Sequence, residues 1–125
     1  MIKDRNLNNT EIRDVTVSFE TGEVTATNQI YFPYRVKITK IRGIVTKAIA
    51  DTDNGTITGA NSTGSSTAGT ITCVASDALN TAYSVSPTSN NEVAKDGYYK
   101  LTTAKTTAGG KVLVTLEFTR IGRTA

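Results

Sequence analysis

Residues 111–119 read Lys-Val-Leu-Val-Thr-Leu-Glu-Phe-Thr, and this stretch does most to decide the fold. Every second position on one face is apolar: Val112, Val114, Leu116 and Phe118. A period of two predicts a β-strand with one face buried against a second layer. Leu113 points to the opposite face, so we predict that it is exposed on the sheet and takes part in a subunit contact.

The same kind of signal recurs along the chain. Strand patterns are predicted at 12–19, 29–32, 34–40, 41–50, 55–59, 70–75, 83–85 and 98–103. Gly43 is expected to mark a bulge or bend, and the small polar residues of Ala60–Gly69 and Thr88–Asn91 predict exposed loops. No segment keeps a helical period. Short strands between regular turn signals predict a single all-β domain, an antiparallel β-sandwich with a jelly-roll-like form.

The beginning of the chain is set apart by its composition. Residues 1–11 are polar and rich in Asn, with Leu7 as the main apolar residue after Ile2. We interpret 1–11 as an N-terminal arm and 12–125 as the sandwich domain. The arm is either a segment that orders on binding, with Leu7 as its anchor, or a frayed terminus.

Charge is unevenly distributed. The chain of 125 residues carries a net charge of +3, yet residues 51–92 contain no Lys or Arg. Such a long block without a cation is not typical of a nucleic-acid surface, so we predict no nucleic-acid partner. Arg35 and Lys37 share one strand face, which is either a solvated face or a basic patch that docks on an acidic protein. On the docking hypothesis the arm and these two cations face the partner, and the loops of the cation-free block face outward.

Residues for chemistry are scarce. The chain has no His and a single Cys, which excludes Ser-His-Asp, Cys-His and classical zinc sites. Cys73 lies in a strand-like run and is predicted to be a buried free thiol. Asp51 and Asp53 before Asn54-Gly55 faintly resemble a calcium loop, but the glycine comes one residue early and Ser62 replaces the closing acid. An ordinary hairpin turn is the favoured interpretation. We therefore predict no enzyme activity, catalytic residue, cofactor or metal.

Membrane association is not expected either. No run of 18 apolar residues occurs, and Met1–Thr10 lacks a basic-then-apolar leader. These features predict a protein made in a cytosol.

Several stretches resemble a known class of proteins. These stretches are Lys40–Asp51, Gly55–Thr58, Ile71–Ser76, Ser86–Gly97 and Leu101–Phe118. Their cadence and composition are similar to head decoration (cement) proteins of tailed bacteriophages, some of them head-fibre proteins, over about residues 30–119. The resemblance implies a homotrimer without cofactor that binds the major capsid protein on the outer capsid surface. The second hypothesis is a receptor- or carbohydrate-binding module of a phage fibre or tail, with exposed Tyr and polar loops carrying the binding.

Overall fold

The computed structural model describes residues 10–121, and within this range the chain forms nine strands and no helix. The strands are β1 (Glu11–Ser18), β2 (Thr27–Phe32), β3 (Val36–Lys47), β4 (Gly55–Ala60), β5 (Ser65–Cys73), β6 (Ala82–Val85), β7 (Glu92–Val93), β8 (Gly97–Ala104) and β9 (Lys111–Arg120). Leu7 and most of the predicted arm lie outside the described residues. The first described strand begins at Glu11.

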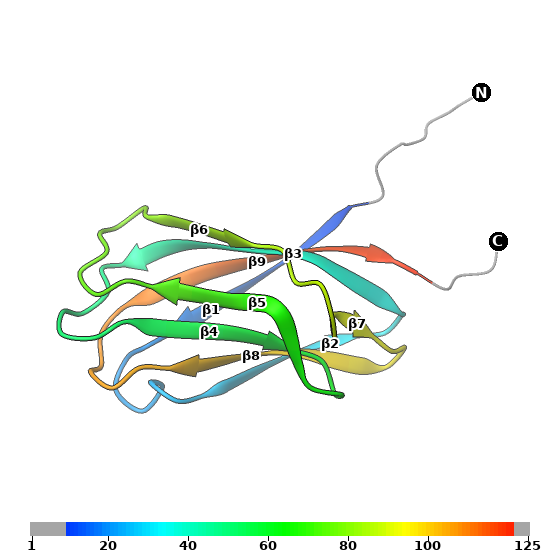
Figure 1. Cartoon of the computed structure of the whole chain (residues 1–125), viewed down its shortest axis with the longest axis horizontal. Helices are drawn as coiled ribbons and strands as arrows, with labels where there is room; N and C mark the ends of the chain where they lie inside the picture. Colours follow the sequence, from blue (N-terminus) through cyan, green and yellow to red (C-terminus); the bar gives the residue numbers. More distant parts are fainter. Residues whose placement is uncertain (1–9, 122–125) are drawn as a thin grey trace, which may run out of the picture.

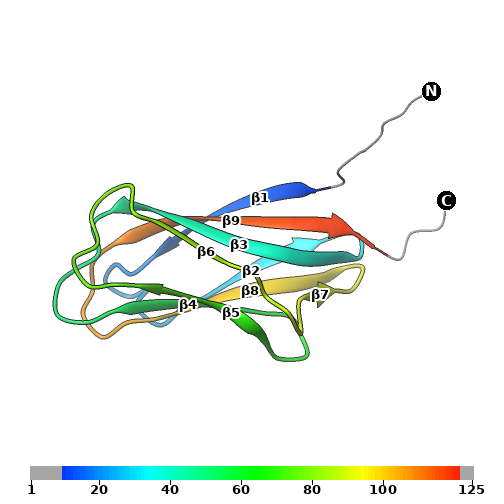
Figure 2. The same ribbon diagram turned by 45° about the horizontal axis from the view of Figure 1, so that its top comes forward.

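The strands form two antiparallel sheets that pack face to face (Figure 1). Sheet A has the order β1-β9-β3-β6, with the two-residue β7 also paired to β3, and sheet B has the order β2-β8-β4-β5. In Figure 2, β9 and β3 of sheet A lie above β4 and β5 of sheet B. The prediction of a single antiparallel β-sandwich is confirmed. β1 and β9, from the two ends of the described chain, are neighbours in sheet A, and consecutive strands such as β1 and β2 or β8 and β9 lie in different sheets.

The alternation seen in the sequence of β9 is reproduced in the structure. Val112, Val114 and Leu116 are fully buried, while Leu113 on the opposite face is half-buried. β9 pairs with β1 on one side and with β3 on the other, so it is a central strand of sheet A. A central strand has its backbone groups hydrogen-bonded on both sides, and its buried face lies at the centre of the core.

β3 is one long strand, and the prediction of two separate stretches at 34–40 and 41–50 is wrong. The pairing with β9 shifts between Ile38 and Lys40, which marks a β-bulge at Thr39. The bulge changes the phase of the alternation, so Ile38 and Ile41 both point into the core. Gly43 is not the bulge, because it pairs in register with Val114. Its position is crowded instead: a Cβ there would lie 3.0 Å from Val112 Cγ1.

The prediction of an exposed loop over Ala60–Gly69 is also wrong. Only 61–64 is a turn, and β5 begins at Ser65. Ser66 is buried, and its hydroxyl hydrogen-bonds to the carbonyl of Asn90 at 3.0 Å and shares a hydrogen bond of 2.9 Å with the Tyr99 hydroxyl. Small side chains let this part of β5 pack closely, so a run without apolar residues becomes a strand.

The core is filled mainly by Val and Ile, with a few aromatic rings between them. Its largest fully buried side chains are Tyr99, Phe19 and Phe32. Tyr98, next to Tyr99 on β8, points to the outer face and is half-buried. Cys73 is a buried free thiol, as predicted, and burial raises the pKa of its thiol to about 12.

Gly59 and Tyr99 are in such close contact that their stability effects should be coupled. A Cβ at position 59 would lie 2.3 Å from the Tyr99 hydroxyl oxygen and 2.8 Å from Ile41 Cδ1. Gly59→Ala should lower the free energy of unfolding by about 2 kcal/mol through overpacking. In a Tyr99→Phe background the hydroxyl is absent, so the same substitution should cost less. Urea denaturation of all four proteins of the cycle measures this coupling.

The matched control is Gly64→Ala, where the nearest atom to a new Cβ is Asn90 Nδ2 at 3.5 Å. This change should stay within about 0.5 kcal/mol of the parent protein. Strictly additive effects of Gly59→Ala and Tyr99→Phe would contradict the packing described here.

Candidate functional site

One end of the sandwich gathers the described ends of the chain and the start of β3. β1 begins at Glu11 beside the end of β9, and an ion pair of 2.8 Å joins Glu11 to Arg120. The Arg120 guanidinium carbon also lies 3.7 Å from the centre of the Tyr34 ring. The Arg35 carbonyl accepts a hydrogen bond from the amide of Ile121 at 3.0 Å. The structure therefore brings Arg35 to the end of the sandwich where β1 begins and β9 ends (Figures 1 and 2).

Three of the five basic residues between positions 35 and 47 have acidic partners. Arg35 forms an ion pair of 3.0 Å with Glu92, Lys47 forms one of 2.9 Å with Glu20, and Arg42 pairs with Glu117. Lys37 and Lys40 have no ion pair with any other described residue. Exposed pairs such as Arg35–Glu92 contribute only about 0–1 kcal/mol, so Arg35 can exchange Glu92 for a carboxylate on another protein. The cluster is thus less basic than its sequence suggests.

Lys37 borders a shallow polar hollow that the sequence did not reveal. Asn61, the loop 88–91 and Glu92 line the rest of the hollow, which has a volume of about 330 Å³. The Asn61 side chain donates a hydrogen bond of 2.8 Å to the Glu92 carbonyl and so joins the β4–β5 turn to β7. The loops predicted to face away from Arg35 and Lys37 therefore lie at the same end of the molecule, and one partner can contact both.

Leu113 lies in a small apolar patch on the outer face of sheet A. It is directly opposite Ile44 on β3, and Ile44 is opposite Ala82 on β6. Ile44 is 38% exposed, and a hollow of about 250 Å³ between these residues also reaches Tyr83. Nothing in the sequence marks Ile44 as an exposed residue. Its outward position follows from the change of phase at the Thr39 bulge, because Ile41 and Val45 take the inner positions.

Beside Asp53, the position that a metal ion would take is occupied by the ammonium group of Lys105. The Lys105 side chain is fully buried, and its ammonium contacts Asp53 Oδ1 at 3.0 Å, the Asp53 carbonyl at 2.8 Å and the Ala50 carbonyl at 3.3 Å. Three oxygen contacts match the three donors of an ammonium group. Over residues 10–121 no three side chains of His, Cys, Asp or Glu are grouped as a metal site. Of the two aspartates of the calcium-loop resemblance, Asp53 binds Lys105 and Asp51 accepts a hydrogen bond from Ser76.

Asp53 is held as an anion by this arrangement. Its carboxylate accepts hydrogen bonds from the amides of Thr106 at 2.7 Å and Thr107 at 3.1 Å, in addition to the contact with Lys105. The Thr106 amide, and next the Lys105 ammonium, lower the pKa of Asp53 to about 2. This network joins the 105–107 connection to the β3–β4 connection at the end opposite Arg35, so its role is structural.

No described segment is a helix long and apolar enough to cross a membrane. No protein-family model matches the chain, and no curated protein matches it either. Among solved structures, a chain of the cyanophage Pam1 capsid asymmetric unit is similar, with 10% identity, 97% of this chain and 94% of that chain covered, and a TM-score of 0.52.

Two further structures are more distant. PirA is 11% identical, the match covers 90% of this chain and 96% of PirA, and the TM-score is 0.45. The P-domain of the Macrobrachium rosenbergii nodavirus is 8% identical, the match covers 90% of this chain and 94% of that chain, and the TM-score is 0.37. Both TM-scores lie below 0.5, so of these three comparisons the cyanophage one supports a shared fold. That likeness extends over almost the whole of both chains.

Acid should weaken the fold through Asp53. The pKa of Asp53 is about 2 in the folded chain and 3.8 for an ordinary Asp, so its stabilising contribution is present above pH 3.8 and is lost as the pH falls toward 2. Asp53→Asn should be less stable than the parent near neutral pH and should lose less stability between pH 4 and pH 2. Urea denaturation across this pH range measures both effects.

Asp51→Asn is the matched control, because Asp51 accepts a hydrogen bond from Ser76 and has no contact with the Lys105 ammonium. It should keep the acid sensitivity of the parent. If Asp53→Asn and Asp51→Asn respond equally to acid, the Lys105 network is not what couples this end of the fold to pH.

Proposed function

We propose that this chain is a bacteriophage capsid decoration protein that is made in the host cytoplasm, binds the outer surface of the head and stabilises it. The observation that carries the proposal is the likeness in fold, over 97% of the chain, to a chain of a cyanophage capsid asymmetric unit. A protein that bridges capsid subunits adds binding energy to each of many repeated contacts and so opposes the pressure of the packed DNA. A rigid β-sandwich suits that role.

The contact with the major capsid protein is assigned to the end that carries Arg35 and Lys37. Lys37 is exposed and has no acidic partner among the described residues, while Arg35 has only the exposed Glu92. Both can pair with carboxylates on the capsid, which would orient the docking protein. β1 begins at this same end, and the preceding arm is proposed to add Leu7 as an apolar anchor beside the two cations.

The oligomer is proposed to be a homotrimer built through the patch of Leu113, Ile44 and Ala82. In a closed three-fold ring the patch of each copy contacts a different surface of its neighbour, and the ring does not continue into open-ended filaments. The patch lies on the face of sheet A, whereas Arg35 and Lys37 lie at the end of the sandwich, so trimer contact and capsid contact do not compete for the same residues.

Reversing the charge at both cations should weaken capsid binding. We expect Arg35→Glu with Lys37→Glu to bind to particles stripped of this chain at least tenfold more weakly, because two attractive charge pairs become repulsive. Cosedimentation with stripped particles measures the binding. The matched control is Lys111→Glu on sheet A, which should bind as the parent does. Unchanged binding of the double variant would remove Arg35 and Lys37 from the capsid contact.

Copy number separates this function from the alternative of a fibre or tail module that binds a receptor or carbohydrate. A decoration protein is present in hundreds of copies per particle, and a fibre protein in a handful. Quantitative mass spectrometry of purified particles gives the number directly. A handful of copies would refute the decoration function.

The trimer should depend on the Leu113 patch. Leu113→Asp places a carboxylate opposite Ile44, where it would be desolvated in an interface, so we expect the trimer to dissociate to monomers at micromolar concentration. Sedimentation velocity, with and without particles, measures the assembly state. Thr119→Asp, on the same strand face but away from the patch, should leave the trimer intact. A stable dimer in both conditions would exclude the trimer.

A further inference from the structure

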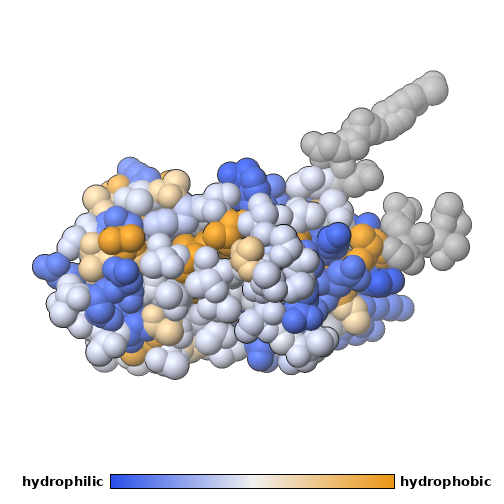
Figure 3. All heavy atoms as spheres, viewed as in Figure 1, coloured by the Kyte–Doolittle hydropathy of each residue, from blue (hydrophilic) through white to orange (hydrophobic). Residues whose placement is uncertain are grey.

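The outer face of sheet B is a nearly uncharged surface covered with hydroxyl groups. Its four strands, β2, β8, β4 and β5, contain no Asp or Glu and only one cation, Lys100. One row across all four strands consists of threonines that are directly opposite one another: Thr27, Thr102, Thr58 and Thr70. In Figure 3, pale residues of intermediate hydropathy cover much of the visible surface, with a few hydrophobic residues among them, and strongly hydrophilic residues are most numerous toward the two ends.

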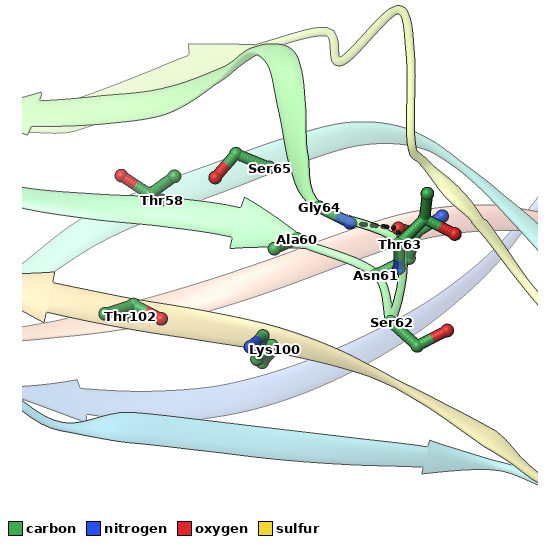
Figure 4. A pocket seen from close by; sticks show the side chains of 9 residues that line it. All are labelled: Thr58, Ala60, Asn61, Ser62, Thr63, Gly64, Ser65, Lys100 and Thr102. Carbon is green, nitrogen blue, oxygen red and sulfur yellow. Dashed lines mark hydrogen bonds between the residues drawn. The ribbon is translucent and has the colours of Figure 1, made fainter.

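Lys100 stands in the middle of this face without a partner. It is half-buried, it lies opposite Gln29 on one side and Ala60 on the other, and it has no hydrogen bond or ion pair with another described residue. Beside it is an open hollow of about 440 Å³, whose rim carries the hydroxyls of Thr58, Ser62, Ser65 and Thr102 (Figure 4). A lone ammonium in a sheet without carboxylates attracts an anion, and the surrounding hydroxyls can donate and accept hydrogen bonds.

Two tyrosines continue the same face next to Lys100. Tyr31 on β2 is directly opposite Tyr98 on β8, and Tyr31 is 53% exposed. The Tyr31 hydroxyl donates a hydrogen bond of 2.7 Å to Asp96, and the Tyr31 carbonyl accepts one of 2.9 Å from Arg13. These contacts fix the Tyr31 side chain and its backbone, so the ring is positioned before any ligand arrives. A fixed, exposed aromatic ring loses little conformational entropy when an amphipathic ring stacks on it.

The composition of this face argues for a sugar rather than a protein or a nucleic acid. A stable protein interface has a desolvated apolar core, and the outer positions here are mainly Thr, Gln and Tyr. A nucleic acid is bound by neutralising several phosphates, and this sheet offers one cation. A carbohydrate presents both an apolar ring face and many hydroxyls. A sugar acid also carries a carboxylate, which can form an ion pair with Lys100.

We propose that the outer face of sheet B binds an acidic polysaccharide, with sugar rings against Tyr31 and Tyr98, a sugar carboxylate on Lys100 and sugar hydroxyls in the hollow beside β4. This site lies on the opposite layer from the Leu113 patch. The inference goes beyond the decoration function and does not depend on it, since binding of sugars by the isolated chain and binding of the chain to particles are measured separately.

The test uses the full chain and isothermal titration calorimetry with short oligomers of galacturonate, mannuronate and a glucuronate-containing disaccharide repeat. At least one acid oligomer should bind, and its carboxyl-reduced counterpart should bind about tenfold more weakly, because one charge-assisted contact is lost. Lys100→Met should reduce binding of the acid oligomer to the level of the reduced one. Tyr31→Ala should abolish measurable binding, while Tyr31→Phe, which keeps the ring, should retain it.

The matched control is Lys111→Met, which removes a lysine without an ion pair from sheet A and should leave binding unchanged. Thermal unfolding of every variant shows whether it is folded, and Lys100→Arg should bind if Lys100→Met fails to fold. Absence of binding to all three acid oligomers would overturn the proposal. So would equal binding of acid and reduced oligomers, equal effects of Lys111→Met and Lys100→Met, or loss of particle binding in the folded Lys100→Met protein, which would make this face a capsid contact.

Discussion

The hydroxyl of Tyr99 lies in the interior of the sandwich, and much of one end of the molecule depends on where it is placed. The ring fills the space above Gly59, and only a residue without a side chain leaves that space open. The hydroxyl shares a hydrogen bond with Ser66, which also bonds to the carbonyl of Asn90. A buried hydroxyl is stable only when it is bonded, so this chain of contacts fixes β5 and the loop before β7 together. The proposed capsid-facing end is thus built on a rigid part of the core.

The two outer faces of the sandwich differ in a way that suits different partners. Sheet A carries several exposed ion pairs around a small apolar patch, whereas sheet B carries hydroxyls, two tyrosines and one unpaired lysine. Apolar atoms gain from contact with another protein, while scattered hydroxyls gain little from it and keep their hydrogen bonds with water or a sugar. The chemistry of each face therefore favours a subunit contact through sheet A and leaves sheet B free for a small or polymeric ligand.

The sequence was sufficient for the fold class because the period of two in β9 is a local signal of a half-buried strand. Strand order could not be predicted, since it depends on pairings between distant segments, such as β1 with β9. The bulge at Thr39 changes the phase of the apolar alternation between Ile38 and Ile41, and in the sequence this change is indistinguishable from a boundary between two strands. The strand that begins at Ser65 has no alternation of large apolar residues to mark it. Burial of Lys105 was missed as well: lysine is rarely buried, and its oxygen partners at Ala50 and Asp53 are found only in the folded chain. The candidate surfaces combine residues from several strands, so residue type alone could not assemble them.

A weak sugar site would still be effective on a protein that covers a capsid. A contact of one lysine and two exposed tyrosines gives low affinity for each copy, because binding must overcome the lost freedom of both partners. On a particle the copies are held at fixed spacings, and a polysaccharide can engage several of them in succession. Each later contact is then effectively intramolecular, so avidity can exceed the single-site affinity by about 10²–10⁴ without any new contact. Repetition on the particle therefore compensates for a shallow site, and a sandwich needs no deep pocket to hold a long acidic polymer.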